Sequence, residues 1–101
     1  MKDNMEDIQE NQTSGLFALG EIIVTEGAMG ALAHCDISKG IARHHSGDWG
    51  AIYVEDKELN DRALVHGGRL VSMYCCDTGP KFLIITEADR SRTTVLLPVE
   101  Y

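Results

Sequence analysis

Cysteine is scarce in this sequence of 101 residues, which contains only Cys35, Cys75 and Cys76. An odd number of cysteines argues against the paired disulfide framework on which many small secreted domains depend. The chain also lacks the C-x-x-C and H-E-x-x-H motifs whose spacing suits a zinc ion. We therefore expect no disulfide scaffold, no bound metal and no cofactor.

Long apolar runs are also missing. Runs such as Ile22–Val24 and Leu83–Ile85 are only a few residues long, whereas a membrane-spanning helix needs roughly 20 apolar residues. The sequence does not open with a basic stretch followed by an apolar one, so no secretory signal is expected. These features predict a cytoplasmic protein without a membrane partner.

A surplus of positive charge is absent as well. The chain has 16 acidic and 9 basic residues, a formal net charge of −7, which excludes a generic basic nucleic-acid binder. Residues 1–14 hold four of the acids and one lysine, so the rest of the chain has 12 acids against 8 bases. Because residues 1–14 are almost entirely polar, they predict a disordered acidic tail, followed by a single domain over residues 15–101.

The remaining sequence alternates between β-branched runs and helix-forming segments, separated by turn residues. Gly67 and Gly68 should end a helix, and the residues 77–80 should form a tight turn between two strands. The patterns predict strands at Glu21–Thr25, Arg69–Cys76, Lys81–Glu87 and Thr93–Leu97, and helices at Glu26–Cys35, Ile37–His45 and Asp56–His66.

This order, β-α-α-α-β-β-β, predicts an α+β fold with a C-terminal three-stranded antiparallel meander covered by helices on one face. Helical spacing places Met29 and Leu32 on the inner face of the first helix, and Leu59 and Ala63 on that of the third. Thr25 and Asp36 are candidate N-caps. A core of this size leaves room for a homodimer, which would remove further apolar surface from water.

The segment Arg43–Gly50 is the most unusual one, because it gathers an arginine, two histidines, an aspartate and the only tryptophan. One interpretation is structural: His44 packs inward, Trp49 anchors the loop, and Arg43 complements the helix C-terminus. The other is a ligand site, in which Arg43 binds phosphate, His44 acts as an acid, base or donor, and Trp49 stacks on a base. Asp48 would then accept from a base or ribose.

A second polar segment, Thr86–Thr94, connects two predicted strands. It is either a charged hairpin loop with local Asp–Arg pairing or an anion or nucleotide clamp built from Arg90, Ser91 and Thr93. The loop is long and polar for a simple hairpin, and polar loops often carry function.

Arg69, Ser72 and Tyr74 form a third group on the strand before that loop. Alternation places Ser72 and Tyr74 on one face and Arg69 on the other. Ser72 is not part of a G-x-S-x-G elbow, so it is not expected to be a nucleophile. The P-loop and dinucleotide fingerprints are absent too.

Two blocks of sequence, RHxxGDWG at residues 43–50 and ITEADRSxTTxLLPxEY at residues 85–101, stand out together with Asn60, Arg69, Ser72 and Tyr74. Between Phe17 and Tyr101 the chain resembles a family of short bacterial proteins that are carried by plasmids and other mobile elements. The resemblance implies a mobile-element setting. Small acidic proteins of such elements often inhibit host defence, and by analogy the same role is expected of this chain.

Three hypotheses about function follow. The first is a non-catalytic anti-defence inhibitor that binds a nucleotide-like ligand or a host defence protein. The second is a small hydrolase or phosphodiesterase acting on a nucleotide or RNA. In it His44 or His45 is the base, Asp48 orients the base, and Arg90 stabilises developing charge. The third is a module that binds a protein through its acidic surface. The candidate binding residues of the first hypothesis are Arg43, His44, Asp48, Trp49, Arg69, Tyr74, Asp89, Arg90 and Ser91.

Overall fold

The computed structural model describes residues 15–77 and 79–101, and the acidic tail predicted for residues 1–14 lies outside them. Helices and strands follow the predicted order, and a short 3₁₀ helix is added at the end. The elements are β1 (Glu21–Val24), α2 (Glu26–Ala31), α3 (His34–His45), α4 (Val54–His66), β2 (Leu70–Cys75), β3 (Lys81–Thr86), β4 (Arg92–Leu96) and η1 (Pro98–Glu100).

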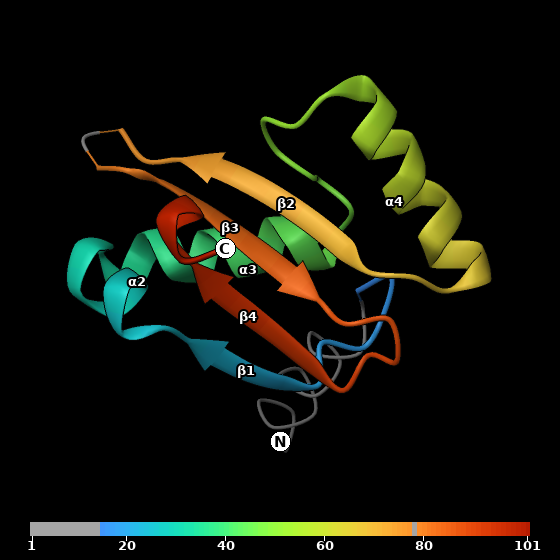
Figure 1. Ribbon diagram of the computed structural model, residues 1–101, viewed down its shortest axis with the longest axis horizontal. Coiled ribbons are helices and arrows are strands. Elements are labelled where there is room, and N and C mark those ends of the chain that lie inside the picture. Colours follow the sequence, from blue (N-terminus) through green and yellow to red (C-terminus); the bar gives the residue numbers. More distant parts are fainter. Residues whose placement is uncertain (1–14, 78) are drawn as a thin grey trace, which may run out of the picture.

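The four strands form one sheet in the order β1-β4-β3-β2 (Figure 1). The predicted meander is confirmed, because β2 pairs with β3 and β3 with β4, both antiparallel. The sheet is nevertheless mixed, since β1 joins it parallel to β4, with Ile23 opposite Thr94. Three helices separate β1 from the meander, and such a long connection permits the parallel orientation that tight turns exclude.

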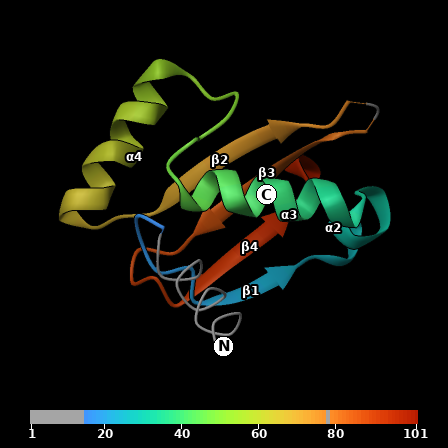
Figure 2. The same ribbon diagram turned by 180° about the vertical axis from the view of Figure 1, so that it is seen from behind.

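Helices α2 and α3 lie over one face of the sheet, whereas α4 lies beside β2 at its edge (Figures 1 and 2). The residues of β2 alternate, so that Leu70, Ser72 and Tyr74 are buried on one face of the sheet and their neighbours are less covered. The helices therefore cover one face, as predicted, but α4 covers the edge of β2.

The ends of the helices agree only partly with the prediction. Thr25 is the N-cap of α2 and its hydroxyl accepts from the Ala28 N–H at 3.1 Å, as expected. Gly67 ends α4 with a φ of 89°, a conformation that glycine adopts readily. The prediction of Asp36 as an N-cap is wrong, because α3 begins at His34 after Ala33. None of the helices in the described ranges has the length and apolar character needed to cross a membrane.

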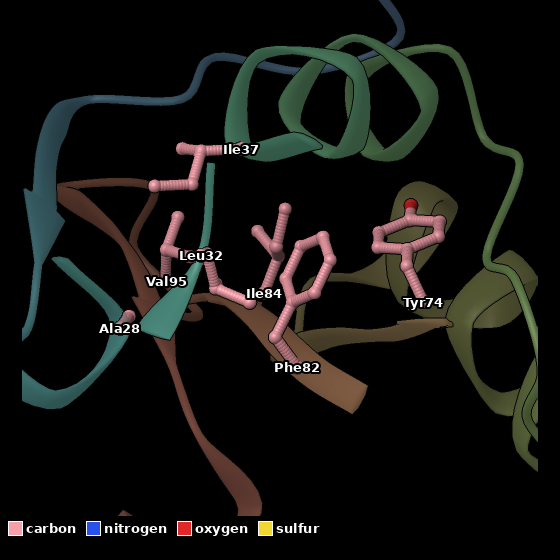
Figure 3. Close-up of a cluster of buried hydrophobic side chains, with 7 residues drawn as sticks. All are labelled: Ala28, Leu32, Ile37, Tyr74, Phe82, Ile84 and Val95. Atoms are coloured by element: carbon pink, nitrogen blue, oxygen red, sulfur yellow. The ribbon is translucent and has the colours of Figure 1, made fainter. Parts of the chain in front are cut away.

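The main core lies between α2, α3 and the sheet (Figure 3). Its buried side chains are Ala28, Leu32, Ile37, Tyr74, Phe82, Ile84 and Val95. Gly40 brings α3 close to the sheet, since a Cβ atom there would stand only 2.8 Å from the Phe82 ring. A smaller cluster of Trp49, Ala63 and Leu70 connects α4 to the end of β2.

Two predicted inner positions face solvent instead. Met29 is 55% exposed and Leu59 is 56% exposed, so these predictions are wrong. In α4 the inward position is taken by Asn60, whose side chain donates to the Val71 carbonyl at 2.8 Å and accepts from the Val71 N–H at 3.1 Å. The side chain of Asn60 thus pairs with the outer edge of β2 as a neighbouring strand would.

The C-terminal residues fold back onto the start of α2. Glu100 accepts hydrogen bonds from the Thr25 hydroxyl at 2.6 Å and from the Leu97 N–H at 2.8 Å. The hydrogen bond from Thr25 is the main reason why the pKa of Glu100 is lowered. The PxEY end of the chain is therefore built into the fold through a carboxylate at the first turn of a helix.

Candidate functional site

Arg43, Asp48 and Tyr74 are three predicted site residues that lie together. The Arg43 guanidinium donates to both carboxylate oxygens of Asp48, at 2.7 and 3.2 Å, and its Cζ lies 4.7 Å from the centre of the Tyr74 ring. The Tyr74 hydroxyl donates to the Asp48 carbonyl at 2.7 Å. The hydrogen bond from Arg43 lowers the pKa of Asp48, and burial raises the pKa of Tyr74 to about 12. Because the guanidinium is already paired with a carboxylate, it is poorly placed to bind phosphate.

A shallow groove of about 150 Å³ lies beside this cluster. Its charged lining consists of Asp36, Asp77, Lys39 and Arg43, so that acids and bases balance. Small-molecule sites usually measure roughly 300–1,000 Å³, and the groove is too small to enclose a nucleotide. Burial is the main reason why the pKa of the Cys76 thiol at its wall is raised, which makes the thiol less reactive.

His44 is the centre of a buried row of hydrogen bonds that runs across the sheet. The side chain has no exposed surface, and its Nδ1 and Nε2 lie 2.6 Å from Ser72 Oγ and 2.9 Å from Thr86 Oγ1. Thr86 Oγ1 is 2.7 Å from Thr93 Oγ1, which donates to the Leu19 carbonyl at 2.6 Å. Burial is the largest of the causes that lower the pKa of His44 to about 4, so the ring is neutral near pH 7.

The donor and the acceptor in each of these hydrogen bonds follow from the last contact, between Thr93 and the Leu19 carbonyl. A carbonyl oxygen only accepts, so Thr93 donates to Leu19 and must accept from Thr86. Thr86 then accepts from Nε2 of His44, and Nδ1 accepts from the Ser72 hydroxyl. The contacts therefore select the neutral ring that carries its proton on Nε2.

The Ser72–His44 contact has the length expected of a nucleophile and its base. However, both side chains are fully buried, so a substrate cannot reach either of them. Asp48, the predicted orienting partner of the base, is bound to Arg43 instead. This geometry does not fit the hydrolase hypothesis, and it agrees with the inward-packing interpretation of His44.

Trp49 is part of the interior. It is 4% exposed, and its indole N–H donates to the Asp61 carboxylate at 3.1 Å. Its ring stacks on Phe17, with centroids 6.2 Å apart and an angle of 26° between the ring planes. The indole face is therefore covered by protein, and Trp49 anchors its loop to α4.

Arg90 joins the β3–β4 loop to the C-terminal turn of α4. Its Nη1 donates to the carbonyls of Gly68, Glu87 and Ala88 at 2.6, 3.1 and 3.1 Å, and its Nη2 donates to the Ala63 carbonyl at 3.0 Å. Arg90 also has a φ of 62°, which is unusual for a residue with a side chain. With four carbonyl acceptors around it, the guanidinium is a structural cation and not the centre of an anion clamp.

Asp89, Ser91 and Arg69 lie away from the Arg43 cluster. Asp89 accepts from the Ser91 N–H at 3.0 Å, a local turn in the β3–β4 loop, and hydrogen bonds with Ser91 lower the pKa of Asp89. Arg69 precedes β2 and donates to the Tyr101 hydroxyl at 3.3 Å. Five residues of extended strand, roughly 16 Å, separate Arg69 from Tyr74. The predicted site residues thus form several separate structural groups.

The arrangement leaves no converging set of arginines for a phosphate ligand. Within residues 15–77 and 79–101, no group of three or more His, Cys, Asp or Glu side chains is arranged to hold a metal ion. No family model, curated protein or solved structure matches this chain.

The surface that sequence reasoning missed is the outer side of α4. Apart from Ala63 and the half-buried Leu64, the apolar residues of this helix are exposed, as is Tyr53 just before it. The sequence signal was Asn60, which lies one turn before Leu64 and shares its face. If Asn60 is assigned to the inner face, Leu59 turns outward.

Proposed function

We propose that this chain is a non-catalytic binding protein whose partner is another protein, and that α4 makes the contact. The observation that carries the proposal is the exposed apolar surface of α4. Val54, Leu59 and Val65 are each more than half exposed, and Tyr53 is 79% exposed. Single exposed apolar residues are ordinary, but several of them on one short helix resemble a protein-binding patch.

The spacing and charge of α4 indicate what kind of surface would fit it. Val54, Glu58, Asp61 and Val65 follow the spacing i, i+4, i+7, i+11, so they lie along one side of the helix. The helix has four acidic residues and only two basic ones, apart from a histidine at its end. On this side the carboxylates of Glu58 and Asp61 lie between Val54 and Val65, so the complementary surface has basic groups at its centre and an apolar contact at each end.

Basic groups on a surface are typical of proteins that bind nucleic acid. We therefore propose that the partner is a host defence protein that binds nucleic acid. The chain would act in the cytoplasm on behalf of a plasmid or another mobile element, as the family resemblance implies. The net charge of −7 supports this choice, because it attracts basic partners over a distance.

The contacts of the arginines favour a protein partner over a nucleotide-like ligand. Arg43 is paired with Asp48, and Arg90 is surrounded by carbonyl oxygens. Arg69 is exposed, but it lies at the other end of β2 from the Arg43 cluster. Neither paired guanidinium is available to a phosphate ligand, whereas the outer side of α4 presents several exposed apolar side chains to a protein.

The Leu59→Lys/Val65→Lys double variant is expected to lose its anti-defence effect while remaining folded, because lysine is a good helix former and both sites are exposed. The measurement is the transfer of a plasmid that encodes the chain into a host with a nuclease-based defence. We expect wild type to raise transfer by about tenfold or more, and the double variant to abolish the gain.

The matched control is Val99→Lys, which adds a lysine at a site that is 89% exposed and outside α4. This variant should protect the plasmid as wild type does. Equal protection by the α4 double variant would contradict the proposal. So would a thermal-shift screen in which a cyclic or linear nucleotide stabilises wild type but not Arg69→Ala, because that result would favour the ligand-binding hypothesis.

A further inference from the structure

The two edges of the sheet differ in how their outward backbone groups are hydrogen-bonded. On the β2 edge, Asn60 satisfies both backbone groups of Val71. Met73 donates to the Trp49 carbonyl at 3.2 Å and accepts from the Ala51 N–H at 2.7 Å. These contacts cover the outward backbone groups of Val71 and Met73 with protein, which hinders another strand from pairing there.

Among residues 15–77 and 79–101, no such hydrogen bonds cover the β1 edge. Glu21 and Thr25 donate to carbonyls of the β4 side at 3.0 Å, so alternation turns the backbone groups of Ile22 and Val24 away from the sheet. Within the described residues, no strand pairs with that outer side. Glu21–Val24 also contains no proline or lysine, which are the residues that commonly protect an edge strand.

Apolar side chains flank this open edge. Ile22 is 45% exposed, although it belongs to the face of the sheet on which α3 lies. Met29, on the neighbouring helix α2, is also exposed. A hollow of about 150 Å³ lies beside Met29, and its mostly apolar lining includes Val24 and Ile37. An added strand would therefore find both hydrogen-bonding groups and apolar contacts.

We propose that β1 pairs antiparallel with β1 of a second copy of this chain, about a twofold axis that passes through Ile23. In this register Ile22 is opposite the partner's Val24, and Val24 is opposite the partner's Ile22. All four residues have outward backbone groups, so they form two hydrogen-bonded pairs, with the two Ile23 residues as the closer, non-hydrogen-bonded pair between them. The four strands of each copy join into one continuous sheet.

The chemistry of the edge favours a second copy as the occupant. A twofold contact brings each residue near its own counterpart, so like charges close to the axis would repel. Here the three residues nearest the axis, Ile22–Val24, are uncharged and β-branched, and such side chains pair well across strands. Glu21 would lie opposite the partner's Thr25, which avoids a carboxylate pair. The β1 sequence is therefore complementary to itself.

Sedimentation equilibrium of the full chain is the first test. We expect a dimer with a dissociation constant below about 100 μM, and we expect Ile22→Lys to weaken it by about tenfold or more. The matched control, Val65→Lys, changes an exposed residue of α4 and should leave the dimer intact. A chain that remains monomeric at millimolar concentration, or an unchanged dimer in Ile22→Lys, would overturn the proposal.

Disulfide trapping tests the register. Non-hydrogen-bonded partners have Cα atoms about 4.5 Å apart, which is within the range of a disulfide. In a background where the three native cysteines are serine, Ile23→Cys should cross-link two copies rapidly, whereas Ile22→Cys should do so at least about tenfold more slowly. Preferential cross-linking of Ile22→Cys would overturn the axis at Ile23. None of these outcomes depends on α4, so this inference and the proposed function fail separately.

Discussion

The His44→Ala variant is expected to lose about 3–5 kcal/mol of unfolding free energy, the largest effect that we predict. The substitution removes a fully buried ring and leaves a cavity beneath α3. It also leaves the Ser72 hydroxyl without its acceptor and Thr86 without its donor, in a place that water does not reach. Urea unfolding followed by circular dichroism measures the loss. A change of less than about 1 kcal/mol would contradict the buried network.

His45→Ala is the matched control, because His45 is the adjacent histidine on α3 and its side chain makes one hydrogen bond, from a ring nitrogen to the Phe17 carbonyl at 2.8 Å. It should be clearly less destabilised than His44→Ala. If the two variants unfold alike, the row of hydroxyl groups does not contribute as described.

The pH dependence of stability provides a separate check on the neutral ring. Burial lowers the pKa of His44 to about 4 in the folded chain, against 6.5 for an unburied histidine. The unfolded chain therefore takes up a proton at higher pH than the folded chain. The contribution of His44 to stability is complete above pH 6.5 and is lost as the pH falls from 6.5 towards 4. Between pH 7 and pH 5 this amounts to about 2 kcal/mol, and the His44→Gln variant should lack this part of the dependence.

The Arg90→Ala variant is expected to lose about 2–4 kcal/mol, the second of the large effects. Four carbonyl groups would lose a charged donor, and the C-terminal turn of α4 would lose its connection to the β3–β4 loop. The same urea unfolding experiment measures the change. Arg92→Ala removes an exposed arginine from the adjacent strand and should change stability by less than about 0.5 kcal/mol.

Arg90→Gly separates the hydrogen bonds from the backbone conformation. Glycine accepts a positive φ without strain, so this variant removes the guanidinium while relieving any cost of the φ of 62°. We expect it to remain destabilised, though less than Arg90→Ala. A glycine variant as stable as wild type would show that the four hydrogen bonds contribute little.

Most of the fold could be predicted from the sequence because its signals are local. Alternation identified the strands of the meander, and Gly67 marked the end of α4. The parallel position of β1 is not a local property. It depends on which edge of the meander β1 joins. The β-branched sequence of Glu21–Val24 predicts a strand, but it does not indicate whether that strand pairs with β4 or with β2.

The roles of the polar residues could not be predicted for a similar reason. His44 meets Ser72 and Thr86, which are 28 and 42 residues away, and only these contacts decide between a buried and a reactive histidine. Arg90 likewise reaches carbonyls 22 and 27 residues away. In α4 the inner face contains Asn60 where the prediction had Leu59. This difference corresponds to a rotation of the helix by about 100°, and it places Leu59 on the surface.

The positions of β1 and α4 at opposite edges of the sheet have a consequence for the strength of binding (Figure 1). A dimer joined through β1 would carry one α4 at each of its far ends, so pairing and partner binding would not compete for surface. A target that offers two sites at matching separation would then be held with avidity, since the second contact forms at a high effective concentration. Against a target with a single site, the same dimer would gain nothing over the monomer.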